Sequence, residues 1–351
     1  GVSIKGSEIA EDFPEVVHLA EKPLLRTAPA PLHRLSKLVR QTGFKVVLTG
    51  EGADELFGGY DIFKETKVRR FWAKQPDSRL RPLLFKRLYP YLTRDTNKAG
   101  TFLSHFFSQG LTETSDPLYS HQIRFNNTSR SLRFLDGGVL EEATLQGDSK
   151  QRLLNYLPEN FAHFSNLSKA QYLEIHTFLS GYLLSSQGDR MLMGNSVEGR
   201  FPFLDYRVAE FAAKLPDRLR MQGLQEKFLL RKAVAPLLPK NIGRREKRPY
   251  SSPILQAFIG SDAPAYVQEL LEPTHLAKVG LFKPEAVKQL VEKCERLVSS
   301  SVGETDEMAL VGIISTLLLH EKMIDRPVLA SAAKATKVVI GSNIQPPVLQ
   351  S

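Results

Sequence analysis

Helical spacing of apolar residues dominates the chain. The stretch 169–187 repeats apolar side chains every three or four residues, which predicts an amphipathic helix. Its apolar face consists of Tyr172, Ile175, Leu179 and Leu183. A second long helix is predicted over 304–324, with Thr305 as N-cap and acidic residues in its first turn. From about 61 to 165 the pattern is mostly helical. Polar loops are expected at 94–100, 126–131 and 136–150.

One short segment has the pattern of a strand. Phe44–Leu48 (FKVVL) is apolar, partly β-branched and bounded by glycines, which is typical of a fully buried strand in a parallel sheet. A helix is expected over 32–39, and residues 1–30 are expected to be rich in loops because they hold several prolines. A lone parallel strand would leave its backbone groups unpaired. Other strands must therefore lie in weaker segments or in sequence outside this chain.

Composition excludes several classes of protein. The 351 residues are 42% hydrophobic and 24% charged, with a mean hydropathy of −0.22, as in a globular protein of one large or two ordinary domains. The longest nearly apolar stretch, 308–319, has 12 residues, whereas a membrane-spanning helix needs about 20. The single cysteine, Cys294, excludes an internal disulfide or a four-cysteine zinc site. We therefore expect a cytoplasmic protein without a membrane partner.

The positive charge is concentrated in two stretches. The net charge is +9, and both 67–94 and 214–248 are rich in Lys and Arg, which favours anionic partners. Aromatic residues are interleaved with the first stretch, which is compatible with nucleic-acid binding. These are Phe71, Trp72, Phe85, Tyr89 and Tyr91. The alternative is a set of solvated helix faces with buried aromatics, and no sequence-specific nucleic-acid partner is expected.

Acidic residues follow the predicted strand. Glu51, Asp54 and Glu55 lie just beyond it, next to two glycines that allow a ligand to approach the backbone. Ligands of open α/β sheets bind beyond the carboxyl ends of the strands. Carboxylates beside a phosphate require a cation between them, and Mg²⁺ is commonly held by one or two carboxylates plus phosphate oxygens. A glycine turn that precedes a helix with acids in its first turn would explain the same residues without any ligand.

A longer string carries a family resemblance. Residues 46–60, VVLTGEGADELFGGY, resemble the signature of the asparagine synthetase family, which consists of ATP-dependent, amide-forming amidotransferases. Further blocks that resemble this family follow in the same order. They are QGDRM at 187–191, NSVEGRFPFLD at 195–205, Glu226-Lys227 with Leu230-Arg231, REKRPY at 245–250 and ETDEMALVG at 304–312.

The resemblance implies a fold and a reaction. The fold would be an α/β synthetase domain of the adenine nucleotide alpha-hydrolase-like (PP-loop ATPase) type, with an incomplete parallel sheet and a largely helical remainder. We expect this domain to cover 1–325 and a loosely structured tail to cover 326–351. The family activates the aspartate side chain with ATP as a β-aspartyl-adenylate, and ammonia then displaces AMP.

It also implies roles for the residues after the strand. Leu48, Thr49 and Gly50 would contact ATP, and Asp54 would hold Mg²⁺ at the pyrophosphate. Glu51 would be the base that takes a proton as ammonia attacks, a role that suits a carboxylate with a raised pKa.

Roles for three distant residues follow from the other blocks. Lys247 would neutralise charge on the α-phosphate and at the reacting centre. Asp189 and Arg200 could bind the amino and carboxylate groups of aspartate, because Arg is a natural bidentate partner of a carboxylate. As an alternative, Asp189 and Arg200 could form a buried pair that fixes two helices.

The sequence departs from the family pattern at two points. The family's glutaminase domain begins with a nucleophilic Cys, whereas this chain begins with Gly1, and the family's SGGxDS pyrophosphate loop is absent from it. We therefore expect the C-terminal portion of a synthetase, inactive alone, whose partners are aspartate, ammonia or glutamine-derived nitrogen, and an N-terminal glutaminase portion. A homodimer is a further expectation.

Two other functions stay open. Pro249-Tyr250 stands where the family more often has Gly-Phe, which is compatible with a subgroup of the family, so a related synthetase that forms an amide or lactam on another carboxylate is an alternative. The other alternative is a non-catalytic remnant or partner subunit.

Overall fold

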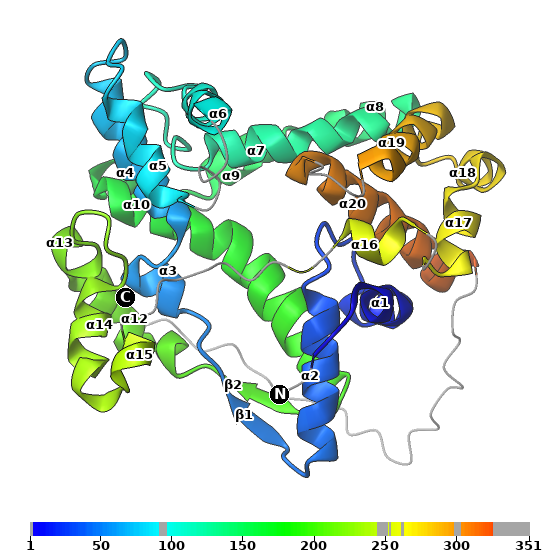
Figure 1. The fold of residues 1–351 in the computed structure, drawn as a ribbon, viewed down its shortest axis with the longest axis horizontal. Coiled ribbons are helices and arrows are strands. Elements are labelled where there is room, and N and C mark those ends of the chain that lie inside the picture. Colours follow the sequence, from blue (N-terminus) through cyan, green and yellow to red (C-terminus); the bar gives the residue numbers. More distant parts are fainter. Residues whose placement is uncertain are drawn as a thin grey trace, which may run out of the picture.

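The computed structural model describes residues 3–90, 97–243, 252, 254–260, 263–297 and 303–325. Helices form most of this part of the chain, and its one sheet has two parallel strands (Figure 1). The elements of the first half are α1 (Gly6–Ala20), α2 (Pro29–Gln41), β1 (Val46–Leu48), α3 (Ala53–Phe57), α4 (Asp61–Ala73), η1 (Arg81–Leu84), α5 (Phe85–Leu88), α6 (Asn97–Phe107), α7 (Gln122–Ser129), η2 (Arg130–Phe134), α8 (Gly137–Leu145), α9 (Ser149–Asn155) and η3 (Glu159–His163).

The second half continues the helical pattern. Its elements are α10 (Asn166–Glu174), η4 (Ile175–Asp189), α11 (Arg190–Met193), β2 (Glu198–Arg200), η5 (Pro202–Leu204), α12 (Tyr206–Lys214), α13 (Asp217–Arg220), α14 (Phe228–Val234), η6 (Ala235–Leu237), α15 (Lys240–Gly243), α16 (Leu255–Phe258), α17 (Ala265–Leu271), α18 (Pro273–Val279), α19 (Pro284–Leu297), α20 (Glu304–His320) and η7 (Glu321–Asp325). The expected tail, 326–351, lies outside the described residues.

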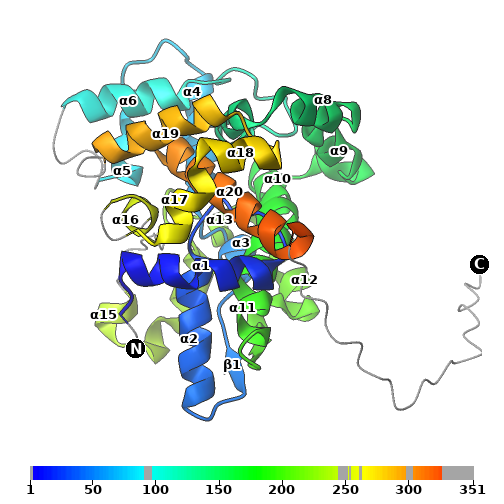
Figure 2. The ribbon, with the colours of Figure 1, turned by 90° about the vertical axis from the view of Figure 1, so that its right-hand side faces the viewer.

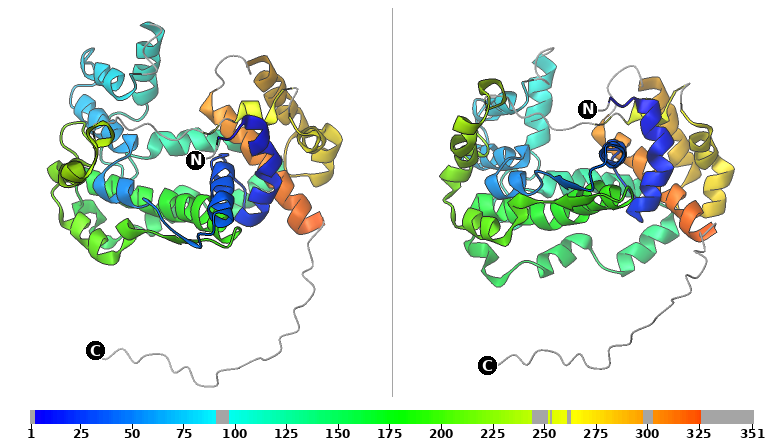
Figure 3. Two further views of the ribbon diagram at one scale, coloured as in Figure 1. Left: turned by 60° about the horizontal axis from the view of Figure 1, so that its bottom comes forward. Right: turned by 90° about the horizontal axis from the view of Figure 1, so that it is seen from below.

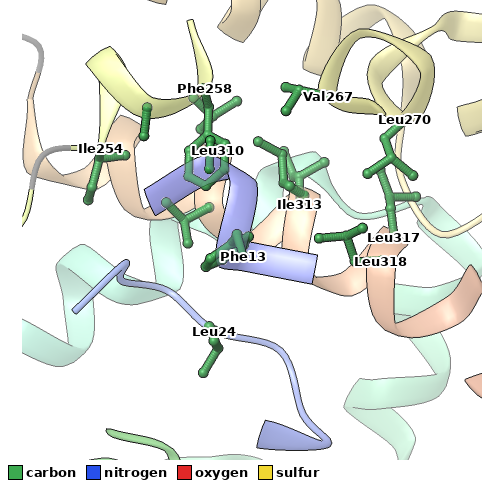
Figure 4. Packing of buried hydrophobic residues seen from close by; sticks show 14 of the residues in the cluster. Phe13, Leu24, Ile254, Phe258, Val267, Leu270, Leu310, Ile313, Leu317 and Leu318 are labelled. Atoms are coloured by element: carbon green, nitrogen blue, oxygen red, sulfur yellow. The ribbon is translucent and has the colours of Figure 1, made fainter. Parts of the chain in front are cut away.

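The main core joins the two ends of the described chain. Helix α1 packs on α16 and α20, and α17 also packs on α20 (Figure 2). The apolar side chains of these helices interdigitate in Figure 4, where the ring centroids of Phe13 and Phe258 lie 5.0 Å apart. The Ser315 hydroxyl accepts a hydrogen bond from the Leu24 N–H at 2.9 Å and donates to the Leu24 carbonyl at 2.8 Å. The predicted helix over 304–324 is therefore confirmed as α20 and η7, and it is a central core element.

The prediction of a loop-rich segment at 1–30 was wrong for 6–20. This segment is helix α1, and Pro14 lies inside it. Proline has no N–H, so the carbonyl of Ala10, four residues earlier, loses its helical donor. The Tyr266 hydroxyl donates to that carbonyl at 2.8 Å. Burial of the apolar face of α1, together with this replacement donor, explains why the proline does not end the helix.

Two of the expected polar loops are helical. Residues 126–131 continue α7 into η2, and most of 136–150 belongs to α8 and α9. The expected loop at 94–100 is helical from 97, where α6 begins, and 94–96 lie outside the described residues. The N-cap of α20 is Gly303 and not Thr305, although Asp306 and Glu307 lie in its first turn as predicted. Asp306 pairs with Arg133 at 2.8 Å and with Lys293 at 2.6 Å.

The predicted helix over 169–187 is part of one long helical run. Elements α10, η4 and α11 follow each other without a break, and η4 is a π-helix of 15 residues. The run is the long green helix that crosses the molecule in Figure 1 and Figure 3. π-Helical segments are often found at functional sites. This one ends at Asp189, so its length determines where that carboxylate lies.

The predicted strand is confirmed, but its expected burial is wrong. Strand β1 pairs in parallel with β2, with Val46 opposite Glu198 and Leu48 opposite Arg200. Phe44 is 65% exposed and Leu48 is 73% exposed. Side chains two residues apart point to the same face of a strand, so Val46 and Leu48 share one exposed face of β1. Phe44, two residues before the strand, is exposed as well, and we call these three apolar residues the β1 face. No element of the described chain covers it.

The single cysteine packs in the core. Cys294 is fully buried in α19 against the cluster around α20. Burial raises the pKa of its thiol to about 11, since an apolar environment disfavours the thiolate. No helix in the described ranges is long and apolar enough to cross a bilayer.

Candidate functional site

Two segments of the sequence meet at the carboxyl edge of the sheet. Beyond the paired strands, the N–H of Thr49 donates to the Arg200 carbonyl at 3.0 Å. The strands are parallel, so both of their carboxyl ends lie at this edge. The turn after β1 therefore lies beside the segment that begins with Arg200. Both segments were predicted to belong to one site, whereas their direct pairing was not predicted.

The turn after β1 has a close-packed backbone. Gly52 adopts a φ of +91°, and a Cβ atom there would lie 2.4 Å from the Leu204 side chain. A side chain at this position would thus be excluded both by conformation and by space. The Thr49 hydroxyl donates a hydrogen bond to the carboxylate of Glu51. This contact orients Glu51 within the turn.

Asp54 has a cationic neighbour from a distant segment. The Lys227 ammonium lies 3.0 Å from the Asp54 carboxylate, and both side chains are about three-quarters buried. Gly59 lies against both, since a Cβ atom there would be 2.1 Å from Asp54 Oδ1 and 2.3 Å from Lys227 Cε. Lys227 adopts a left-handed φ of 50° at the start of α14. The Glu226-Lys227 block indicated the family but not this contact, which only the fold reveals.

Asp189 lies close enough to Glu51 for the two charges to interact. Its pKa is raised above the ordinary value, first by burial and second by the negative charge of Glu51. Two carboxylates in one site favour the neutral form of one of them. Glu51 and Asp189, which were predicted from separate sequence blocks, are thus close enough for their negative charges to interact.

Arg200 is placed at the same edge but is turned towards a neighbour on its own strand. Its guanidinium pairs with Glu198 at 2.7 Å, and its side chain is 61% exposed. A buried pair with Asp189, which was the alternative to substrate binding, is therefore absent, because Arg200 is exposed and bound elsewhere. Leu48 has a mostly exposed side chain at the end of β1. Lys247 lies outside the described residues.

The donor set at this edge fits a magnesium–nucleotide complex. Among the described residues, no group of three or more His, Cys, Asp or Glu side chains forms a complete metal cage. Mg²⁺ does not require one, because phosphate oxygens and water complete its shell. Asp54 offers a carboxylate beside the Lys227 cation. A carboxylate can ligate Mg²⁺ and an ammonium can bind phosphate oxygens, so the two groups are compatible with a Mg²⁺–polyphosphate.

Two hollows in the described chain lie away from this edge. One, of about 310 Å³, is lined by residues 113–126 and Lys150, and the other, of about 280 Å³, lies between α1 and α2. Neither includes a residue that the sequence analysis assigned to the site.

The aromatic residues of the basic stretch 67–94 are mostly not available for base stacking. Trp72 and Phe85 are buried in one core cluster. Phe71 is 45% exposed, and the Arg81 guanidinium lies over its ring, 4.2 Å from the centroid. The Tyr89 hydroxyl donates a hydrogen bond to the Glu65 carboxylate, and Tyr91 lies outside the described residues. Solvated helix faces over a packed core therefore describe this stretch better than a nucleic-acid surface.

Comparison with known proteins gives consistent matches. The asparagine synthase family model matches residues 2–319. Glutamine-hydrolyzing asparagine synthetase 1 of Bacillus subtilis (strain 168) is 30% identical over 251 residues, which cover 72% of this chain and 37% of that protein. Amidase chyE of Penicillium rubens is 27% identical over 305 residues, covering 83% of this chain and 44% of that protein. A putative glutamine-hydrolyzing asparagine synthetase of Mycobacterium tuberculosis (strain H37Rv) is 29% identical over 263 residues, covering 72% and 36%. The chain thus spans between 36% and 44% of the length of these relatives.

Proposed function

Because the chain belongs to the asparagine synthase family, we propose that it is the C-terminal portion of an ATP-dependent asparagine synthetase. Its fold would be the PP-loop ATPase type. One observation carries the proposal: parallel pairing of β1 with β2 brings the acidic turn and the segment after Asp189 to a common edge. In open α/β sheets this edge binds the ligand. Two of the stretches that resemble the family, 46–60 and 195–205, are thus neighbours in the fold.

The proposed reaction has two steps. The aspartate side-chain carboxylate attacks the α-phosphorus of ATP, which forms a β-aspartyl-adenylate and releases pyrophosphate. Ammonia then attacks the activated carbonyl, and AMP leaves as the amide forms. Mg²⁺, when bound, would neutralise charge on the departing pyrophosphate. Asp54 would hold it, and Leu48, Thr49 and Gly50 would contact the nucleotide at the strand end.

Glu51 is proposed as the base of the second step. It would accept the proton that the attacking ammonia loses, and Thr49 orients it for this role. Asp189 would bind the amino group of aspartate, and its nearness to Glu51 would bring acceptor and base together. Arg200 would bind the α-carboxylate, for which it must exchange its contact with Glu198. These surface ion pairs contribute little to stability, so the exchange costs little.

Two lysines would bind the phosphates. Lys247 would neutralise the α-phosphate and the developing charge at the reacting centre. Lys227, which already lies at Asp54, is our addition to the expected set. It would bind the outgoing pyrophosphate next to the metal, because an ammonium is a suitable point charge for phosphate oxygens.

The test requires the longer protein that contains this chain. We expect it to release pyrophosphate and form asparagine in equal amounts from ATP, aspartate and ammonia, and to use glutamine as a nitrogen source. The chain of 351 residues alone is expected to release none, as it holds no SGGxDS loop. A panel of other carboxylates tests the alternative of a related amide- or lactam-forming synthetase, to which the similarity to an amidase gives support. Aspartate-dependent release of pyrophosphate by residues 1–351 alone would contradict the proposal that this chain is inactive without the rest of the synthetase.

The exposed β1 face favours a second role, as a subunit that binds another chain. Parallel sheets are normally covered on both faces, and an uncovered apolar strand promotes association. We expect the isolated chain to associate at rising concentration in light scattering, and Phe44→Ser to reduce the measured mass. Leu145→Ser is the control, because Leu145 is an isolated exposed residue on α8. If both variants have the mass of the unmodified chain, the β1 face is not the contact.

A further inference from the structure

Helix α3, which carries Asp54, is too short to hold its own conformation. It has five residues, from Ala53 to Phe57, and ends at Gly58 in a left-handed conformation. Helices of this length are unstable by themselves in water. Moreover, the last carbonyls of any helix lack helical partners. The position of α3 must therefore be set by contacts from outside it.

The side chain of Gln171 supplies such contacts. Its Nε2 donates to the carbonyl of Glu55 at 2.6 Å and to the carbonyl of Leu56 at 3.0 Å. Gln171 is only 4% exposed and lies on α10. One amide group thus binds two terminal carbonyls of α3. Water has little access to replace it.

Arg220 fixes the orientation of this amide. Its Nη1 donates to Gln171 Oε1 at 2.5 Å, while its Nη2 donates to Ser168 at 2.9 Å and Asp217 at 2.7 Å. Arg220 is 5% exposed. A guanidinium can only donate hydrogen bonds and a carbonyl can only accept them. The amide oxygen must therefore face Arg220 and the amide nitrogen must face α3, and of the uncharged side chains of this length only Gln provides both.

We propose that Gln171, held by Arg220, is a positioning residue that sets where α3 places the Asp54 carboxylate. The long helical run that begins with α10 also carries Asp189 near its other end. Through Gln171, this run determines the placement of Asp54 relative to Asp189. The catalytic consequence rests on the proposed function, whereas the placement of α3 does not.

The sharpest variant is Gln171→Glu. The new side chain has the same size and keeps an ionic contact with Arg220, but its carboxylate turns an oxygen towards the carbonyls of Glu55 and Leu56. Loss of a buried hydrogen bond to each carbonyl is expected to increase hydrogen exchange of the Leu56 and Gly59 amides about tenfold or more. The Leu56 amide donates to the carbonyl of the N-cap residue Gly52 at 2.9 Å, and the Gly59 amide, just after α3, donates to the Asp54 carbonyl at 2.7 Å.

The pH dependence separates positioning from general damage. Protonation of the introduced carboxyl restores a hydrogen-bond donor towards the α3 carbonyls. The protection of the Leu56 and Gly59 amides from hydrogen exchange, corrected for the intrinsic exchange rate, should therefore recover as the pH falls. Arg220 would lower the pKa of this carboxyl, and burial and the nearby Glu55 and Glu174 would raise it. Gln171→Met has neither donor nor charge and should lose protection at every pH. Gln151→Glu, at an exposed glutamine that bonds Asn155, is the matched control.

The outcomes are decisive in each direction. Local loss of protection with recovery at low pH, together with a higher KM for MgATP in the longer protein, supports the proposal. Unchanged protection of α3 in both Gln171 variants overturns the proposal. Lost protection with unaltered kinetics overturns its catalytic consequence. If the unmodified protein shows no ATP-dependent activity at all, the proposed function fails. The exchange measurement still decides whether Gln171 positions α3.

Discussion

Glu51→Gln is expected to slow amide formation about 10²- to 10⁴-fold, the usual contribution of a general base, while formation of the adenylate continues. The amide oxygen of the new side chain can still accept the hydrogen bond from Thr49, so the turn should keep its conformation. Only the ability to take a proton is lost. Measured in the longer protein, aspartate-dependent exchange of pyrophosphate into ATP should persist, whereas asparagine production from ammonia should fall.

A second readout of this variant does not depend on catalysis. The charge of Glu51 contributes to the raised pKa of Asp189, so its removal should lower that pKa. Carboxyl titration by NMR would measure the change. Glu142→Gln, at an exposed position on α8, is the control and should alter neither quantity. Equal loss of both half-reactions in Glu51→Gln would argue against a base that acts only on ammonia.

Asp54→Asn is expected to reduce both half-reactions, by about 10²-fold or more, because a charged group that stabilises the departing pyrophosphate serves the first step. The apparent Mg²⁺ requirement should rise in the same variant. The loss also leaves Lys227 without its carboxylate partner. Asp77→Asn removes an equal charge at an exposed position and should leave the kinetics unaltered.

A double-mutant cycle with Lys227→Met tests whether the pair acts as one unit. Residues that share a ligand deviate from additivity, so the double variant should lose less activity than the product of the two single losses. Strict additivity would indicate that Lys227 and Asp54 contact different parts of the substrate. Full activity of Asp54→Asn at the same Mg²⁺ concentration would exclude Asp54 as the metal carboxylate.

The strand and its turn could be predicted from sequence, but the partner strand could not. Phe44–Leu48 has an apolar run between glycines, whereas β2 is Glu198-Gly199-Arg200, which has no strand pattern. It is extended because β1 pairs with it, a long-range contact that no local spacing reports. The contact between Lys227 and Asp54 was missed for the same reason.

Helix α1 shows a different limit of the sequence pattern. Its apolar spacing was outweighed by Pro14, and the compensating donor, Tyr266, lies far along the chain. Local rules treat a proline as the end of a helix, since they cannot include a hydroxyl from another element. Helix α8 was not predicted because none of its residues is buried, so its sequence lacks the apolar periodicity of a helix that packs on a core.

The solitary sulfhydryl of Cys294 offers a way to follow the molecule as it opens. It lies in the core shared by α19 and α20, remote in sequence from the strand ends, and its pKa of about 11 leaves it almost wholly protonated at neutral pH. Alkylating reagents attack the ionised sulfur, so modification requires the helices to separate first. With one such atom per polypeptide, the rate of labelling would report breathing of the helical body by itself. The labelling rate would not report changes at the carboxyl edge of the sheet, so opening of the core could be measured separately from them.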